Sequence, residues 1–181
     1  MAHWCRSSFA LGIPLVVIAA CFGASAAAAT LPKDACTLLQ PADIQASLAL
    51  NEKIGSGSPD TSMAPLGISC VYEWGPRTKE WGKSSLTVNV IDASKAWQGT
   101  SADGVARAIL AKVKPGDPNA AVIPGVGDAA VFTVEPRSNN ATAEAYLKSK
   151  GIDLVVVFHR GNPAKTKDAL VALLKQAIAR L

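Results

Sequence analysis

The stretch that decides the fold is Asp-Leu-Val-Val-Val-Phe-His at residues 153–159, together with the helix that follows it. Five consecutive apolar residues between polar ones are typical of a central strand that is covered on both faces. Further along the chain, apolar residues recur three or four positions apart, which predicts an amphipathic helix at the C-terminus. The residues of this stripe are Leu170, Leu173, Leu174, Ala177, Ile178 and Leu181. The chain therefore combines at least one buried strand with a helix packed against it.

Outward from this strand, other segments alternate apolar and polar side chains, which is the period of a half-buried strand. The expected strands cover residues 68–74, 86–90, 129–134 and 144–148, and a further short strand is left open at 120–123. Gly75 and Pro76 are expected to end the first of these strands, so that residues 77–83 form a long hairpin tip.

Two more helices are expected upstream. One begins at Pro41, because proline suits the first helical position, and the other covers residues 102–114 with an apolar stripe at helical spacing. Residues 51–67 show no period and are expected to form a long loop. The element order is then α-β-β-α-β-β-β-α. Hairpins predict an α+β fold with a mainly antiparallel sheet and helices packed on it, with a faint strand–strand–helix duplication.

Composition narrows the class of protein. The chain has 181 residues, of which 49% are hydrophobic and 18% charged, so it is not a disordered chain. Its length after a leader segment suits one domain at residues 30–181. A net charge of +4 is too small and too dispersed for a nucleic-acid binder.

Residues 1–29 have the three parts of a secretory signal peptide. Arg6 precedes an apolar stretch of fifteen residues at 9–23, and small residues lead to a cleavage site expected just before Thr30. The apolar stretch is shorter than the ~20 residues of a membrane-spanning helix. Export to the periplasm or the medium is therefore expected. An alternative stays open, because residues 18–21 (Ile-Ala-Ala-Cys) match a lipobox that would make Cys21 the lipid anchor of a membrane-tethered lipoprotein.

Cys36 and Cys70 are the cysteines that remain after the leader. Two cysteines in an exported protein most simply form one disulfide bond. A metal or redox pair is the alternative, but it favours closer spacing or neighbouring histidine ligands, and the sequence has neither.

The motif D-A-C-T-L-L-Q-P-A-D-I at residues 34–44 resembles the opening of small exported bacterial proteins of the DUF3558-like family. A second cysteine before an aromatic strand, at residues 70–74, and a Gly-x-Gly-Asp-x-Ala turn at residues 125–130 match the same group. The resemblance implies that the protein is exported, often as a lipoprotein, and that it shares the fold of this family. It implies no activity and no catalytic residue, because the function of the family is largely uncharacterised.

The best candidate binding surface lies at the expected hairpin tip. Indoles and cations gather there within ten positions, at Trp74, Arg77, Lys79, Trp81 and Lys83. Tryptophan and arginine are frequent anchors of binding surfaces. The alternative is a solvated loop with one or both tryptophans packed on the core; Trp97 is expected to pack in the same way.

Candidate chemistry is weak. The G-x-G-x-x-A at residues 125–130 precedes a strand rather than a helix, so it predicts a turn with Asp128 bound to local backbone, not a dinucleotide loop. His159 lacks a visible partner for acid–base or metal chemistry. No cofactor, metal or catalytic residue is predicted. The preferred function is a non-enzymatic binding or accessory module of the envelope, for a ligand, a lipid or an envelope partner. The alternative is an exported hydrolase whose site includes His159 or Asp128 beside the loop at residues 51–67.

Overall fold

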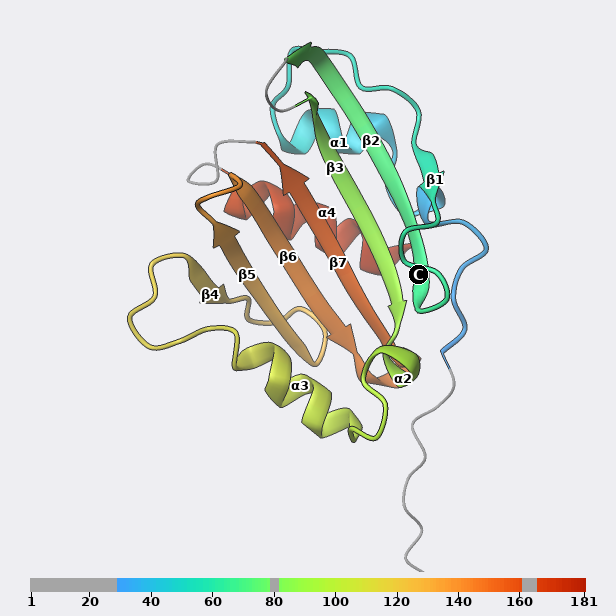
Figure 1. Ribbon diagram of the computed structural model, residues 1–181, viewed down its shortest axis with the longest axis vertical. Coiled ribbons are helices and arrows are strands. Elements are labelled where there is room, and N and C mark those ends of the chain that lie inside the picture. Colours follow the sequence, from blue (N-terminus) through green and yellow to red (C-terminus); the bar gives the residue numbers. More distant parts are fainter. Residues whose placement is uncertain (1–28, 79–81, 161–165) are drawn as a thin grey trace, which may run out of the picture.

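The computed structural model of the protein describes residues 29–78, 82–160 and 166–181 (Figure 1). The strands in these residues are β1 (Ser58–Asp60), β2 (Gly67–Thr78), β3 (Gly82–Asp92), β4 (Ala120–Val122), β5 (Ala129–Glu135), β6 (Asn140–Leu147) and β7 (Ile152–His159). They form a seven-stranded sheet in the order β1-β2-β3-β7-β6-β5-β4, with every neighbouring pair antiparallel. β7 is the central strand, as its apolar sequence predicts.

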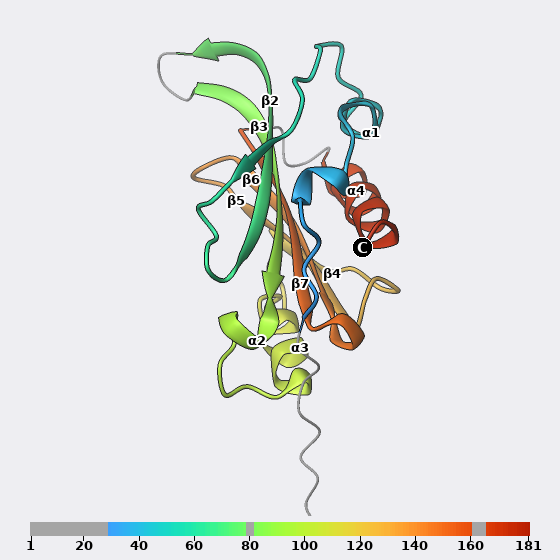
Figure 2. The same ribbon diagram turned by 90° about the vertical axis from the view of Figure 1, so that its right-hand side faces the viewer.

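Helices pack on both faces of the sheet. In the described part of the chain they are α1 (Pro41–Ser47), α2 (Ala93–Ala96), α3 (Ala102–Leu110) and α4 (Lys167–Ala179), with the short 3-10 turns η1 (Ala35–Thr37) and η2 (Lys148–Lys150). Figure 2 shows α1 and α4 together on one side of the sheet. The predicted α+β class, with an antiparallel sheet and helices packed on it, is confirmed.

The main core lies between the sheet and α4. Alternate residues of β7 face it, namely Ile152, Leu154, Val156 and Phe158, and the buried residues of α4 pack over them. The C-terminal stripe contributes Leu170, Leu173, Leu174 and Ala177, all fully buried. Burial of each leucine or valine side chain contributes about 1.5–3 kcal/mol, so this stripe holds α4 against the sheet.

The opposite face of the sheet is covered only in part. Val105 and Ile109 of α3 form a second, smaller core with residues at the start of β5 and the end of β6. Beyond that core, Val155 and Val157 of β7 stay partly exposed. The prediction that this strand is covered on both faces is therefore wrong at Val155 and Val157, because α3 is too short to extend over them.

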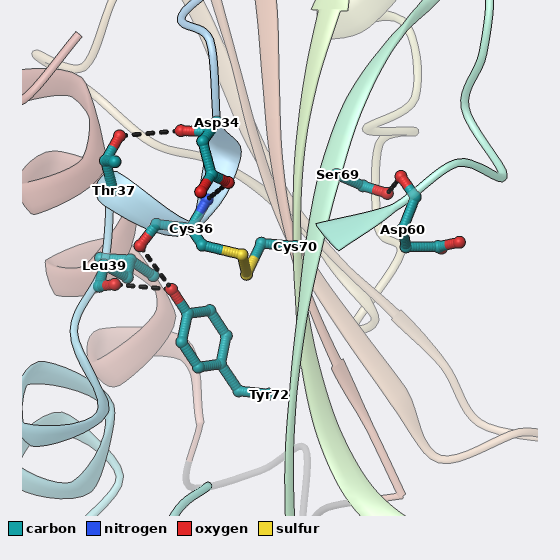
Figure 3. The surroundings of a disulfide bond; sticks show 8 residues. All are labelled: Asp34, Cys36, Thr37, Leu39, Asp60, Ser69, Cys70 and Tyr72. Carbon is teal, nitrogen blue, oxygen red and sulfur yellow. Dashed lines mark hydrogen bonds between the residues drawn. A yellow bond between two sulfur atoms is a disulfide. The ribbon is translucent and has the colours of Figure 1, made fainter. Parts of the chain in front are cut away.

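The predicted disulfide joins η1 to β2. Cys36 and Cys70 are bonded across 34 positions, as Figure 3 shows. The Tyr72 hydroxyl lies 2.6 Å from the carbonyl oxygen of Leu39 and 3.1 Å from that of Cys36, and it donates to them. Because these carbonyls lie beside the disulfide, the covalent bond and the phenol hold the same N-terminal segment on the sheet.

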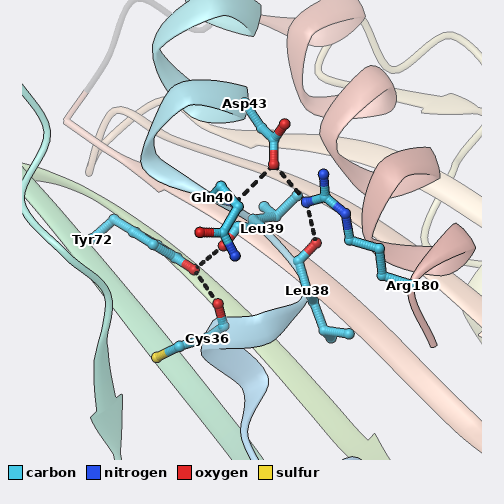
Figure 4. Close-up of polar contacts among 7 residues, drawn as sticks. All are labelled: Cys36, Leu38, Leu39, Gln40, Asp43, Tyr72 and Arg180. Carbon is cyan, nitrogen blue, oxygen red and sulfur yellow. Dashed lines mark hydrogen bonds and ion pairs between the residues drawn. The ribbon is translucent and has the colours of Figure 1, made fainter.

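The C-terminal end of α4 secures the start of α1 (Figure 4). Arg180 Nη1 donates to the Leu38 carbonyl oxygen at 3.0 Å and to Asp43 Oδ2 at 2.5 Å. The same Asp43 oxygen accepts from the Gln40 backbone N–H at 2.8 Å. The hydrogen bond from Arg180 is the largest influence on Asp43 and holds the pKa of that carboxyl below its usual range. Pro41 begins α1 as predicted.

Several element boundaries differ from the sequence predictions. β2 does not end at Gly75 and Pro76 but continues to Thr78, with a register shift between Trp74 and Thr78. Gly75 has a φ of +75°, and a bulge tolerates a proline that cannot donate to the ladder. The hairpin tip is correspondingly shorter than predicted.

Other differences reflect local patterns that tertiary packing overrides. α3 ends at Leu110 rather than at 114, so the apolar spacing continues beyond the helix, and Leu110 itself is 38% exposed. The expected loop at 51–67 contains the edge strand β1.

The expected duplication is seen only in the order of elements, since two strands followed by a helix do occur twice. If the two halves were related by a twofold axis through the antiparallel β3–β7 pair, α3 and α4 would lie on the same face of the sheet. They lie on opposite faces. Within the described ranges, no helix is long and apolar enough to cross a membrane.

Candidate functional site

The open half of the sheet, beside α2 and the end of α3, forms a cavity of about 530 Å³. Its apolar lining comes from Ile91, Ala96, Trp97, Val155 and Val157, and its polar lining from Lys112, Thr133, Thr142, Glu144 and Asp153. This volume lies within the usual range of small-molecule pockets, which are mostly apolar with a few placed polar groups.

Two carboxyl groups meet at one end of this cavity. The register of β6 and β7 pairs Tyr146 with Asp153 and Glu144 with Val155, so Glu144 and Asp153 are diagonal neighbours on one face. Both are buried, with exposed fractions of 5% and 3%. Buried acidic side chains normally have partners, so each of these two needs its interactions accounted for.

Glu144 has a cationic partner. Lys112 Nζ donates to Glu144 Oε1 at 2.6 Å and to Oε2 at 2.5 Å. The lysine side chain is 40% exposed, and it enters from the turn that follows α3. The packing of Val105 and Ile109 on the second core positions this turn over β6. The charge of Glu144 is therefore neutralised from the solvent side of the cavity.

Asp153 is not satisfied in this way. Its Oδ1 atom is buried and has no hydrogen-bond partner among the residues that the structure describes. Burial, and after it the neighbouring charge of Glu144, raise the pKa of Asp153 to about 7, although Lys112 and the Trp97 side chain act in the opposite direction. Asp153 therefore exchanges a proton near neutral pH, inside a cavity that a small molecule can enter.

Trp74 is not an exposed member of the predicted cluster of indoles and cations. Trp74 is 4% exposed and stacks on Phe158 with ring centroids 5.6 Å apart, so it is a core residue rather than a surface anchor. Arg77 and Lys83 are exposed, and Lys83 lies 3.9 Å from Glu73. Lys79 and Trp81 lie outside the described residues. Binding through the exposed cations stays a prediction.

The hydrolase alternative places His159 or Asp128 in its site, and a pocket that joins the two residues would support it. His159 ends β7, where its ring lies 3.3 Å from the Thr87 hydroxyl, and burial together with Arg160 lowers its pKa. Asp128 lies at the other end of the sheet, before β5, and its Oδ2 accepts from the Lys148 backbone N–H at 2.7 Å. The two residues are therefore too far apart to act together. Asp128 fixes a turn as predicted, although its partner is not local.

The important cavity residues were not predicted from the sequence. Glu144 and Asp153 are each the first residue of an expected strand, and neither is a predicted site residue. β6 in fact begins at Asn140, which places Glu144 in mid-strand among small and apolar residues. A carboxylate inside a buried strand is the signal that could have identified it. Trp97 packs against the second core as expected, but it also lines the cavity.

The remaining predictions concern the N-terminal leader, metal binding and membership of a family. Of the expected leader at residues 1–29, which contains Cys21, all but residue 29 lies outside the described residues, so the leader stays a prediction. No group of three or more potential metal ligands is found in the described ranges. Comparisons with protein-family models, curated proteins and solved structures give no match to this chain.

Proposed function

We propose that this protein is an exported, disulfide-bonded binding module that holds a small ligand in the cavity on the open face of its sheet. The observation that carries this proposal is Asp153, a buried carboxyl whose Oδ1 lacks a partner in the described chain and which lines an accessible cavity. Such a group is costly to the fold, and groups of this kind cluster at functional sites.

The location of the module is part of the proposal. The leader at residues 1–29 and the Cys36–Cys70 bond support export, and the motif at 34–44 supports membership of the DUF3558-like family. Mass spectrometry of the mature protein tests both versions of export. A chain beginning near Thr30 supports a released protein, a lipidated Cys21 supports a tethered one, and an unprocessed chain would contradict export.

Ligand binding is tested with two uncharged probes, indole and 2-phenylethanol, added to the exported, disulfide-bonded protein at millimolar concentration. We expect amide NMR shifts to concentrate at the cavity strands, around Glu144 and Val155. A Val157→Trp variant fills the cavity and should abolish these shifts. Val71→Trp is the matched control: Val71 of β2 and Val157 of β7 both pair with Thr87 of β3, so this ring lies on the same face of the sheet but outside the cavity lining. Shifts spread over the surface, or equal in both variants, would contradict the proposal.

A further inference from the structure

The polar end of the cavity has an imbalance of charge and hydrogen bonding. Lys112 is the one cation that lines it in the described chain, and both oxygens of Glu144 engage that lysine. An ionised Asp153 therefore leaves one negative charge without a cationic partner. A hydrogen-bond donor with a positive charge, entering from the open side, would supply both the missing donor for Oδ1 and the missing charge.

The rest of the cavity indicates what that cation is attached to. Val155, Val157 and Ile91 form an apolar floor, and Trp97 adds an aromatic side chain, the residue type that most favours contact with cations. We propose that the ligand is an organic monocation, an amine with an apolar body, whose ammonium group binds between Asp153 and Glu144. This inference rests on the proposed ligand-binding function and specifies its chemical class.

Binding of such a ligand must be coupled to proton release. With the pKa of Asp153 at about 7, the carboxyl is neutral in most molecules at pH 6 and ionised in most at pH 8. Only the ionised form can pair with an ammonium group, so the affinity for an amine should rise roughly tenfold between these pH values, following the ionised fraction.

The charged and titratable neighbours of Asp153 come from several elements. Glu144 and Tyr146 face it from β6, Lys112 reaches toward it from the turn after α3, and Trp97 approaches from the end of α2. On the other side, β3 pairs Ile91 with Asp153 and contributes no charge there. Burial raises the pKa of Tyr146 from its ordinary value of 10.0, so this phenol stays neutral between pH 6 and 8.

The experiment compares three probes that share a phenyl group and differ in the charge of the head group. They are 2-phenylethylamine, 2-phenylethanol and phenylacetate, titrated into the exported protein at pH 6 and pH 8 and followed by NMR shifts of the cavity amides. We expect the amine to bind at least tenfold more tightly than the alcohol at pH 8, and phenylacetate to bind most weakly. The preference for the amine should largely disappear at pH 6.

Two variants assign this preference to the carboxyl. Asp153→Asn keeps the shape of the side chain and should bind amine and alcohol equally at both pH values. Asp168→Asn removes an exposed carboxylate of α4, on the other side of the sheet, and should leave the preference unchanged.

The outcomes separate this inference from the function on which it rests. Binding of all three probes with equal affinity, or an amine preference that survives in Asp153→Asn, overturns the amine inference and leaves a ligand site in place. Absence of amine shifts at the cavity also overturns it. The proposed function itself fails if the uncharged probes give no shifts concentrated at the cavity, or if Val157→Trp affects those shifts no more than Val71→Trp does.

Discussion

The Asp153→Asn variant also tests how strongly the buried carboxyl destabilises the fold. In the unfolded chain this carboxyl loses its proton near its ordinary pKa of 3.8, whereas in the folded protein its pKa is about 7 because of burial and Glu144. Between these values the folded protein binds more protons than the unfolded chain, so the free energy of unfolding decreases as pH rises. At about 1.4 kcal/mol per pH unit, the loss reaches up to about 4 kcal/mol by pH 7–8.

Asparagine does not ionise, so the variant should escape this loss. We expect the stability difference between Asp153→Asn and the wild type to grow by up to about 4 kcal/mol between pH 4 and pH 8, in favour of the variant. Urea unfolding of the disulfide-bonded protein, followed by tryptophan fluorescence, measures this difference. Asp168→Asn, an exposed carboxylate, should run parallel to the wild type. A parallel profile for Asp153→Asn as well would refute the reasoning that this buried carboxyl is without adequate compensation.

Three further predictions concern the scaffold. Replacing both Cys36 and Cys70 by alanine should lower stability by about 4 kcal/mol, because the bond closes a loop of 34 positions; a midpoint equal to that of the wild type in denaturant would contradict this. Trp74→Ala should cost about 3–5 kcal/mol in the same assay, whereas Arg77→Ala should cost little, since only the former leaves a hole in the core. Burial raises the pKa of Tyr72 to about 12 from 10.0, so the wild type should lose stability as pH rises from 10 toward 12. Tyr72→Phe, although less stable by about 1–3 kcal/mol, should not show that alkaline loss.

The elements with a clear local signal were predicted well. The C-terminal stripe, the apolar strand at 153–159 and the helix start at Pro41 each follow from spacing along the chain, because periodicity is a property of neighbouring residues. The boundaries failed where distant contacts override the local signal. Gly75 and Pro76 resemble a strand end, yet pairing with β3 resumes beyond them.

The candidate site could not be predicted from spacing along the chain, because it depends on which residues of different strands become neighbours. Trp74 is part of the predicted cluster at the hairpin tip, but the pleat of β2 directs its side chain into the core, where it stacks on Phe158. Glu144 and Asp153 are nine positions apart in different predicted strands, and Lys112 belongs to a predicted helix. None of these residues carries a motif, so their convergence was not predicted.

By itself the sequence determined the class of fold, the helix that covers the central strand, and the pair of cysteines that an exported chain would join. The pattern at residues 1–29 also predicts a secretory leader, and export stays a prediction. Only the tertiary structure decided that one half of a sheet face stays uncovered and that Glu144 and Asp153 meet there beside Lys112. The physical reason is that strand register and the limited length of α3 set which side chains become neighbours, and these depend on packing between residues far apart in the chain.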